Sequence, residues 1–74
     1  MENMKIKLKK KLDIKGYIYT DMGYSISVEF YDHSVIYNIY EDKYSVYIFN
    51  NENEIIAHRD YKQPLSAINY TLKF

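Results

Sequence analysis

Two histidines, His33 and His58, are the side chains of this 74-residue chain best suited to acid–base or metal chemistry. His33 lies in a predicted turn beside Asp32, and His58 precedes Arg59 and Asp60 near the end of a predicted strand. Catalysis and metal binding both need several such groups that converge on one point, and neither histidine has neighbours with the spacing of metal ligands. We interpret both as ordinary surface residues. The sequence predicts no catalytic or metal-binding residue, and the protein is not expected to be an enzyme.

The remaining polar residues do not form a catalytic arrangement. None of the serines lies in the glycine-framed turn of a serine hydrolase, and the two glycines are too few for a phosphate-binding loop. The chain has no cysteine, which excludes disulfide bonds and thiolate zinc sites and fits a reducing compartment. No apolar run has the length of a signal peptide or a membrane span. The sequence therefore predicts a cytoplasmic protein without a cofactor.

Lysines at alternating positions mark the start of the chain. In residues 4–14, the even positions are apolar except for Lys10, and lysines occupy the odd positions from 5 to 11, so a period of two predicts a strand with an edge or a bulge at Lys10. On a strand these lysines would share one face at a spacing of about 6.6–6.8 Å, which suits a phosphate backbone or an acidic partner. They could equally protect a sheet edge from pairing. The candidate nucleic-acid-binding residues are Lys5, Lys7, Lys9, Lys11 and Lys15, with Tyr17 and Tyr19 as base-stacking side chains.

The charges of the chain are unevenly distributed although they sum to zero. Residues 1–12 carry five lysines and one acid, which gives +4, and residues 13–74 carry five basic and nine acidic residues, which gives −4. The acidic remainder would repel a nucleic-acid backbone. Nucleic acid is therefore the less favoured partner.

Tyrosine is unusually abundant, with ten residues in the chain. A buried phenol needs a hydrogen-bond partner, so we expect several of these rings to be exposed. Tyrosine is favoured at recognition surfaces because it offers a large contact area at little cost in side-chain entropy, although it is also a good strand former. The predicted protein-binding residues are Tyr37, Tyr40, Tyr44, Tyr47 and Phe49.

Short segments of strand character, separated by polar turns, fill the middle of the chain. Residues 24–30 alternate apolar and polar side chains, the pattern of a strand with one buried face. Residues 35–40 and 44–49 have apolar groups on both faces, which indicates central strands or strands that meet a partner. Further strands are expected at 17–20 and 54–58.

The end of the chain fits two structures. Pro64 suits the first turn of a helix, whereas the alternation of apolar residues from Ile68 to Phe74 fits a strand. We favour the helix because an antiparallel sheet needs a cover for its apolar face. The sequence thus predicts one mainly β (α+β) domain over residues 1–74. It would be a small antiparallel meander of five to six short strands, with a short C-terminal helix packed on one face.

These features predict binding rather than catalysis. A chain of 74 residues buries one small core and leaves little room for a deep ligand cleft. We expect a non-enzymatic domain that masks a surface of a larger host protein or protein complex. Small inhibitors encoded by phages or mobile elements, of the anti-defence or anti-CRISPR kind, would act in this way. A nucleic-acid-binding module and a structural homo-oligomer such as a homodimer are the alternatives, and no membrane partner is predicted.

Overall fold

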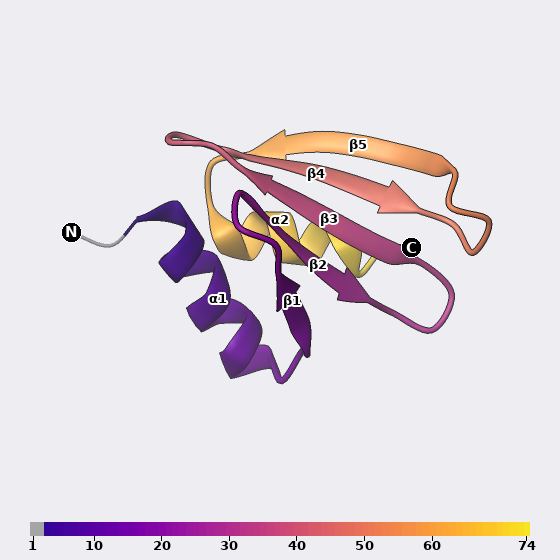
Figure 1. The fold of residues 1–74 in the computed structure, drawn as a ribbon, viewed down its shortest axis with the longest axis horizontal. Helices are drawn as coiled ribbons and strands as arrows, with labels where there is room; N and C mark the ends of the chain where they lie inside the picture. The colour runs from indigo at the N-terminus through magenta and orange to yellow at the C-terminus, as the bar shows by residue number, and fades with distance from the viewer. Residues whose placement is uncertain (1–2) are drawn as a thin grey trace.

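A five-stranded antiparallel sheet organises the structure, and its strands lie side by side in the order of the sequence (Figure 1). The computed structural model describes residues 3–74 of the chain. The elements are α1 (Met4–Lys15), β1 (Tyr19–Asp21), β2 (Ser25–Glu29), β3 (Ser34–Ile39), β4 (Tyr44–Phe49), β5 (Ile55–Tyr61) and α2 (Pro64–Thr71).

Polar side chains close the turns between the strands. In the β1–β2 turn, Asp21 Oδ1 accepts a hydrogen bond from the N–H of Gly23 at 3.0 Å, and Gly23 adopts a φ of 93°. In the β4–β5 turn, Asn50 Oδ1 accepts hydrogen bonds from the N–H groups of Glu52 at 2.9 Å and Glu54 at 3.0 Å. Local bonds of this kind fix tight turns, so each strand returns beside its predecessor. The predicted antiparallel meander is confirmed.

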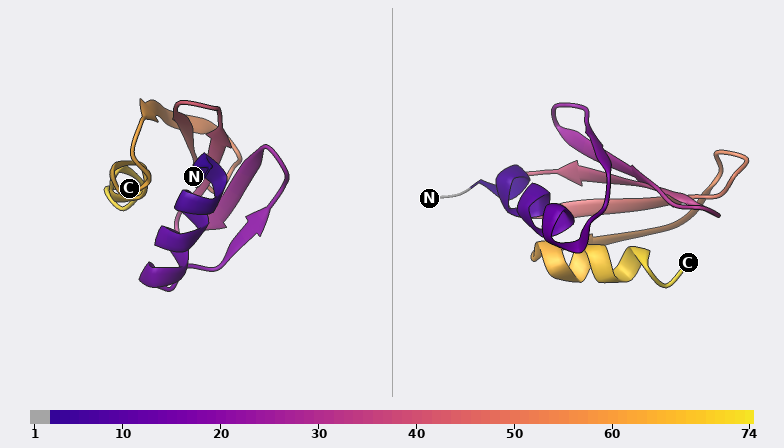
Figure 2. Two further views of the ribbon diagram at one scale, coloured as in Figure 1. Left: turned by 90° about the vertical axis from the view of Figure 1, so that its left-hand side faces the viewer. Right: turned by 90° about the horizontal axis from the view of Figure 1, so that it is seen from below.

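Both helices lie against one face of the sheet, and no helix within residues 3–74 covers the opposite face (Figure 2). The covered face and the two helices share one continuous core of fully buried side chains. The sheet contributes Ile26, Val28, Val35, Tyr37, Tyr44, Val46 and Ile48, and the helices contribute Leu8, Leu12, Ala67 and Ile68. The core therefore joins the two ends of the chain across a single face of the sheet.

The strand predicted over residues 4–14 is wrong, because this segment is the helix α1. Both helix ends carry capping residues. The Asn3 side chain accepts a hydrogen bond from the N–H of Ile6 at 2.8 Å, and Gly16 ends the helix in the left-handed conformation with a φ of 78°. Leu8 and Leu12, four residues apart, face the core, whereas Ile6 and Ile14 are exposed.

The C-terminal helix is confirmed as α2, which begins at Pro64. Proline suits this position because the first N–H groups of a helix have no partner within the helix. Ala67, Ile68 and Thr71 form the buried side of α2, three or four residues apart. The strand before it, β5, is longer than the expected 54–58 and ends at Tyr61.

Two tyrosines predicted to contact a partner, Tyr37 and Tyr44, are instead fully buried in the core. Each phenol has a hydrogen-bond partner on a helix. The Tyr37 hydroxyl lies 3.2 Å from Thr71 Oγ1 of α2, and the Tyr44 hydroxyl donates to the backbone carbonyl of Met4 in α1. Burial raises the pKa of Tyr37 and of Tyr44 to about 12. Because these bonds satisfy the phenols, both rings serve as core residues and cannot be contact residues.

Candidate functional site

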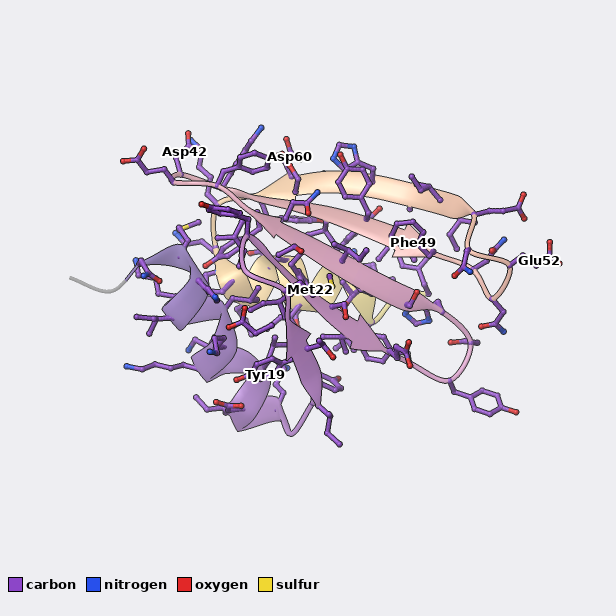
Figure 3. All side chains as sticks on the ribbon, viewed as in Figure 1. Tyr19, Met22, Asp42, Phe49, Glu52 and Asp60 are labelled. Carbon is purple, nitrogen blue, oxygen red and sulfur yellow. The ribbon has the colours of Figure 1, made fainter. Side chains whose placement is uncertain are left out.

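The helix-free side of the sheet (Figure 2), hereafter the open face, carries a cluster of apolar and aromatic side chains over β3, β4 and β5, among them Phe49, which is labelled in Figure 3. Alternation along each strand places these residues opposite the core positions. Ile36, Tyr47 and His58 face one another in register across the three strands. Phe49 and Ile55 form the next pair along the sheet. We call these five residues the Tyr47 patch.

The other half of the open face, over β1 and β2, is polar apart from Ile18, which is exposed just before β1. Thr20 pairs with Ser27, and Ser25 pairs with Asn38 of β3. These short side chains offer hydrogen-bonding groups but little apolar area. The contact potential of the open face is therefore concentrated in the Tyr47 patch.

Tyr47 is held in place by its neighbours on the open face. Its ring stacks on the imidazole of His58, with ring centroids 4.2 Å apart and an angle of 10° between the planes. His58 Nε2 lies 3.2 Å from Asp60 Oδ1, which also accepts a hydrogen bond from the Ser45 hydroxyl at 2.7 Å. The Lys43 ammonium donates to Asp60 Oδ2 at 3.1 Å. An aromatic side chain oriented in this way loses little conformational freedom when it binds.

The charges of this network stabilise one another. The hydrogen bonds from Ser45 and Lys43, in that order, lower the pKa of the Asp60 carboxyl, with a smaller contribution from the charge of His58. The same contact with Asp60 raises the pKa of Lys43. The Ser45 hydroxyl donates to Asp60 and not to His58, so His58 is not placed to accept a proton from Ser45. The arrangement orients Tyr47 and does not resemble a nucleophile with its base.

The structure brings together only part of the predicted protein-binding set. Tyr47 and Phe49 lie on the open face, and Tyr40 lies in the β3–β4 turn, where the Lys43 ammonium is 5.4 Å from its ring centroid. Ile36, Ile55 and His58 were missed because the sequence does not show which strands are neighbours. The register of the strands shows which residues are neighbours: Ile36 of β3 and His58 of β5 pair with Tyr47 from its two sides.

The predicted row of lysines on one face does not form. In the helix α1, the side chains of lysines two residues apart point in different directions. Lys5 and Lys9 approach Asp21, whereas Lys7, Lys11 and Lys15 are exposed and four residues apart.

Tyr17 and Tyr19, which were predicted to stack on bases, pack against the core on the helix-covered side of the sheet. Tyr17 packs edge-on against Phe30, with ring centroids 5.3 Å apart, and both Tyr17 and Tyr19 are half-buried against the core. Neither ring presents an open platform of the kind that stacks bases.

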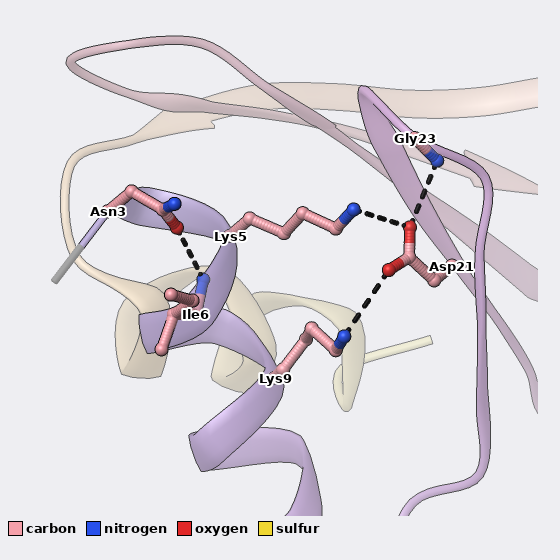
Figure 4. A network of polar contacts seen from close by, with 6 residues as sticks. All are labelled: Asn3, Lys5, Ile6, Lys9, Asp21 and Gly23. Atoms are coloured by element: carbon pink, nitrogen blue, oxygen red, sulfur yellow. Dashed lines mark hydrogen bonds and ion pairs between the residues drawn. The ribbon is translucent and has the colours of Figure 1, made fainter.

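Asp21 ties α1 to the first hairpin of the sheet (Figure 4). Its carboxylate lies 2.7 Å from the Lys5 ammonium and 3.3 Å from that of Lys9, and it accepts the N–H of Gly23. The bond from Lys5, followed by that from Gly23, lowers the pKa of Asp21 to about 2. The ordinary value for an aspartate is about 3.9. Because the pKa is lower in the folded state, the contribution to stability is complete above the ordinary value and is lost as the pH falls towards 2.

We therefore expect Asp21→Asn to lower the midpoint of thermal unfolding at pH 6, and the difference from the unchanged chain to vanish as the pH approaches 2. The effect should be modest and sensitive to salt, since the ion pairs are exposed to solvent. Circular dichroism melts between pH 2 and pH 7 measure it, with Glu52→Gln as a charge-matched control. If the two chains still differ in unfolding midpoint at pH 2 as much as at pH 6, the ionised Asp21 carboxylate is not the source of the stabilisation.

His33 is not a surface residue, contrary to the prediction, since only 6% of it is exposed. Its Nδ1 lies 2.7 Å from Asp32 Oδ1, and its Nε2 lies 3.0 Å from the backbone carbonyl of Thr71 at the end of α2. The ring stacks on Phe30, with centroids 4.7 Å apart. The contact with His33 is the main cause that lowers the pKa of Asp32. His33 thus joins the β2–β3 turn to α2, which is a structural role.

The larger hollows of the surface are open, and no residue of the Tyr47 patch lines them. One of about 500 Å³ lies between the start of α1 and the β3–β4 turn, where Lys5, Lys7 and Glu41 give it mixed charge. Within residues 3–74, no three histidine or acidic side chains are grouped so that they could hold a metal ion. In the same part of the chain, neither helix has the length and apolar character needed to cross a bilayer.

Comparison with known proteins gives no relative: no family model matches the sequence, and neither a curated protein nor a solved structure is significantly similar to the chain. The structure defines the class as a small α+β protein, a five-stranded meander with both helices on one face.

Proposed function

We propose that the protein is a non-enzymatic binding domain that docks onto a larger protein through the Tyr47 patch. The observation that carries this proposal is the position of Tyr47, an oriented aromatic ring on the side of the sheet that no helix covers. Ile36 and Phe49 flank it with apolar area, and a polar network surrounds it. An aromatic anchor with a polar rim is the usual composition of the centre of a protein–protein interface.

The role that we propose for this docking is inhibition. A small stiff domain that covers one patch of a larger protein blocks access to that patch without any chemistry of its own. Proteins of phages and mobile elements that counter host defence systems, including anti-CRISPR proteins, act by masking of this kind. The support for this extension is that this compact domain exposes an apolar patch on a face of its sheet.

An affinity capture with matched variants tests the docking surface. The tagged chain is immobilised, incubated with nuclease-treated host lysate and washed, and retained proteins are quantified by mass spectrometry. We expect one protein at near-stoichiometric level, with affinity at least tenfold lower for Tyr47→Ser, because loss of a central aromatic anchor commonly costs about 2 kcal/mol or more. Tyr31→Ser is the control, since Tyr31 is fully exposed in the β2–β3 turn, outside the patch.

Two results would contradict the proposal. One is a partner that Tyr47→Ser and Tyr31→Ser retain equally well, which would place the contact elsewhere. The other is a folded chain that captures no protein under these conditions. Circular dichroism melts of both variants establish that they are folded.

Nucleic-acid binding is the second candidate, and the exposed lysines of α1 support it. Lys7, Lys11 and Lys15 are exposed and lie one helical turn apart, so they form a stripe along α1 beside the buried leucines. A phosphate backbone could follow such a stripe without any base-stacking side chain. Fluorescence anisotropy with single- and double-stranded oligonucleotides at two salt concentrations decides the question. Binding that weakens steeply with salt supports this candidate, and no binding at low salt removes it.

A further inference from the structure

Two pairs of lysines lie on the two sides of the buried leucines of α1. Lys7 precedes Leu8 and Lys9 follows it, and a helix turns by about 100° per residue, so these two lysines point to opposite sides of Leu8. Lys5 lies about one helical turn before Lys9, and Lys11 lies about one turn after Lys7. The helix therefore presents the same arrangement, a pair of ammonium groups one turn apart, on each side of its buried face.

One of these pairs already holds a carboxylate. The Lys5 and Lys9 ammonium groups lie 2.7 Å and 3.3 Å from the two carboxylate oxygens of Asp21, which ties α1 to the β1–β2 hairpin (Figure 4). Two lysines one turn apart on α1 thus have the reach and the spacing to bind one carboxylate between them.

The other pair lines a groove between the two helices, which contact each other on this side of α1. The groove has a volume of about 350 Å³ and is lined by Lys7, Lys10, Lys11, Ile14, Gln63 and Pro64. The helix α2 has no acidic residue, and within residues 3–74 no carboxylate lies within ion-pair distance of Lys7 or Lys11. The wall that α1 contributes to this groove is therefore positively charged.

Apolar surface lies beside these charges. Ile14 is 77% exposed and lines the groove together with Pro64, the first residue of α2. An isoleucine exposed to this extent adds little to the core. It offers an apolar contact next to the ammonium groups, so the groove combines charge with an apolar surface.

We propose that this groove, hereafter the Lys11 groove, binds a short acidic segment of another protein. A carboxylate of that segment pairs with Lys7 and Lys11, as Asp21 pairs with the lysines on the other side of the helix. A large apolar side chain next to this carboxylate packs on Ile14. The complementary charge and the exposed isoleucine together select this occupant.

A nucleic acid fits the Lys11 groove less well than an acidic segment does. A phosphate backbone gains affinity from many cationic contacts in a row, whereas three lysines line this groove. It gains nothing from an exposed isoleucine. The remainder of the chain, residues 13–74, has a net charge of −4 and repels a long polyanion more strongly than a short segment.

The Lys11 groove and the Tyr47 patch lie on different sides of the molecule. The groove lies between the helices on the covered side of the sheet, whereas the patch lies on the open face (Figure 2). The domain can therefore hold an acidic segment while its open face is docked on a larger protein. The two proposals do not depend on each other.

Titration with designed peptides, followed by NMR, tests the Lys11 groove. The probe is a short peptide of glutamates around a central leucine, and its companion has serine in place of the leucine. We expect the leucine peptide at low salt to shift the amide signals of α1 and of the first turn of α2, and to leave those around Tyr47 in place. The serine peptide should bind about fivefold more weakly, because it lacks the apolar contact.

Charge reversal in the chain identifies the lysines involved. Lys11→Glu should weaken binding of the leucine peptide by about tenfold, because a repulsive pair replaces an attractive one. Lys15→Glu is the matched control, since it makes the same change in the same helix at a lysine that does not line the groove. Its effect should be no more than about twofold. Thermal unfolding establishes that both variants are folded.

Ile14→Ser separates the apolar contact from the charge. It should weaken binding of the leucine peptide about fivefold and leave binding of the serine peptide unchanged, because both substitutions remove the same contact. An interaction that depended on charge alone would not show this coupling.

An oligonucleotide titrated against the same variants distinguishes the other possible ligand. A phosphate backbone that follows the stripe of lysines would be weakened equally by Lys11→Glu and Lys15→Glu. Binding of the oligonucleotide at the same salt concentration, with displacement of the leucine peptide, would assign the groove to nucleic acid and overturn the proposal.

Two further results would also overturn it. One is the absence of shifts in α1 and α2 when the leucine peptide is added at low salt. The other is an equal loss of peptide binding in Lys11→Glu and Lys15→Glu. Failure here is distinct from failure of the docking through the open face, since Tyr47→Ser should leave the peptide titration unchanged and Lys11→Glu should leave capture through the Tyr47 patch unchanged.

Discussion

Replacing Leu12 with alanine is expected to lower the free energy of unfolding by about 2–5 kcal/mol, the usual cost of removing a buried leucine side chain. Leu12 is fully buried in α1 and packs in the core shared with the sheet and α2. A chain of this length has a total stability of about 4–11 kcal/mol. The substitution therefore removes a large fraction of it. Urea unfolding followed by circular dichroism measures the change.

Ile14→Ala provides the matched control, because Ile14 lies in the same helix and is 77% exposed. Its truncation should change the free energy of unfolding by no more than about 0.5 kcal/mol. If residues 4–14 were a strand, Leu12 and Ile14 would share one face and both truncations would be costly. Equal losses at the two positions would thus contradict the helix.

His33→Ala is expected to cost about 2–4 kcal/mol, because it removes two hydrogen bonds and a ring stack from a buried site. His33 bonds Asp32 and the carbonyl of Thr71, and it stacks on Phe30. Hydrogen exchange at the amides of α2 should also accelerate, since the end of this helix loses its contact with the β2–β3 turn. Chemical denaturation and exchange monitored by NMR provide the two measurements.

The same substitution at the other histidine is the control. His58 lies on the open face, where its ring contacts Tyr47, so His58→Ala should cost no more than about 1 kcal/mol and leave exchange in α2 unchanged. A loss at position 33 as small as that at position 58 would show that the buried contacts of His33 contribute little.

The order of the strands was predictable because each strand can be recognised from its own residues and the turns beside it. Alternation in residues 24–30 and polar turns before and after the next two strands are sufficient to predict consecutive antiparallel pairing. Pro64 likewise marked the start of the C-terminal helix. These signals involve neighbouring residues only, so no knowledge of the tertiary structure is required.

The N-terminal segment was misjudged because its pattern fits two periods. Leu8 and Leu12 are four residues apart. They would therefore lie on one face of a strand, where even positions share a side, and also on one face of a helix, where they are about one turn apart. The deciding signals were the capping residues, Asn3 before the segment and Gly16 after it, which frame a helix of twelve residues.

The binding face was only half predictable, because burial depends on contacts between distant segments. Tyr37 and Tyr44 look like Tyr47 in the sequence, yet they point to the other face and bond groups on α2 and α1. His33 was misplaced for the same reason, since its partner Thr71 lies 38 positions away. Knowledge of the register and the helix-covered face would have separated these residues.

The arrangement of the core also determines when the protein can complete its folding. Its covered face is closed by α1, from the start of the chain, and by α2, from its end. The hydrogen bond between Tyr37 and Thr71 cannot form until α2 has emerged from the ribosome. Until then, one apolar side of the sheet remains exposed to solvent. The core therefore closes only after α2 has left the ribosome, and the intermediate without α2 is the form most exposed to aggregation and to chaperones.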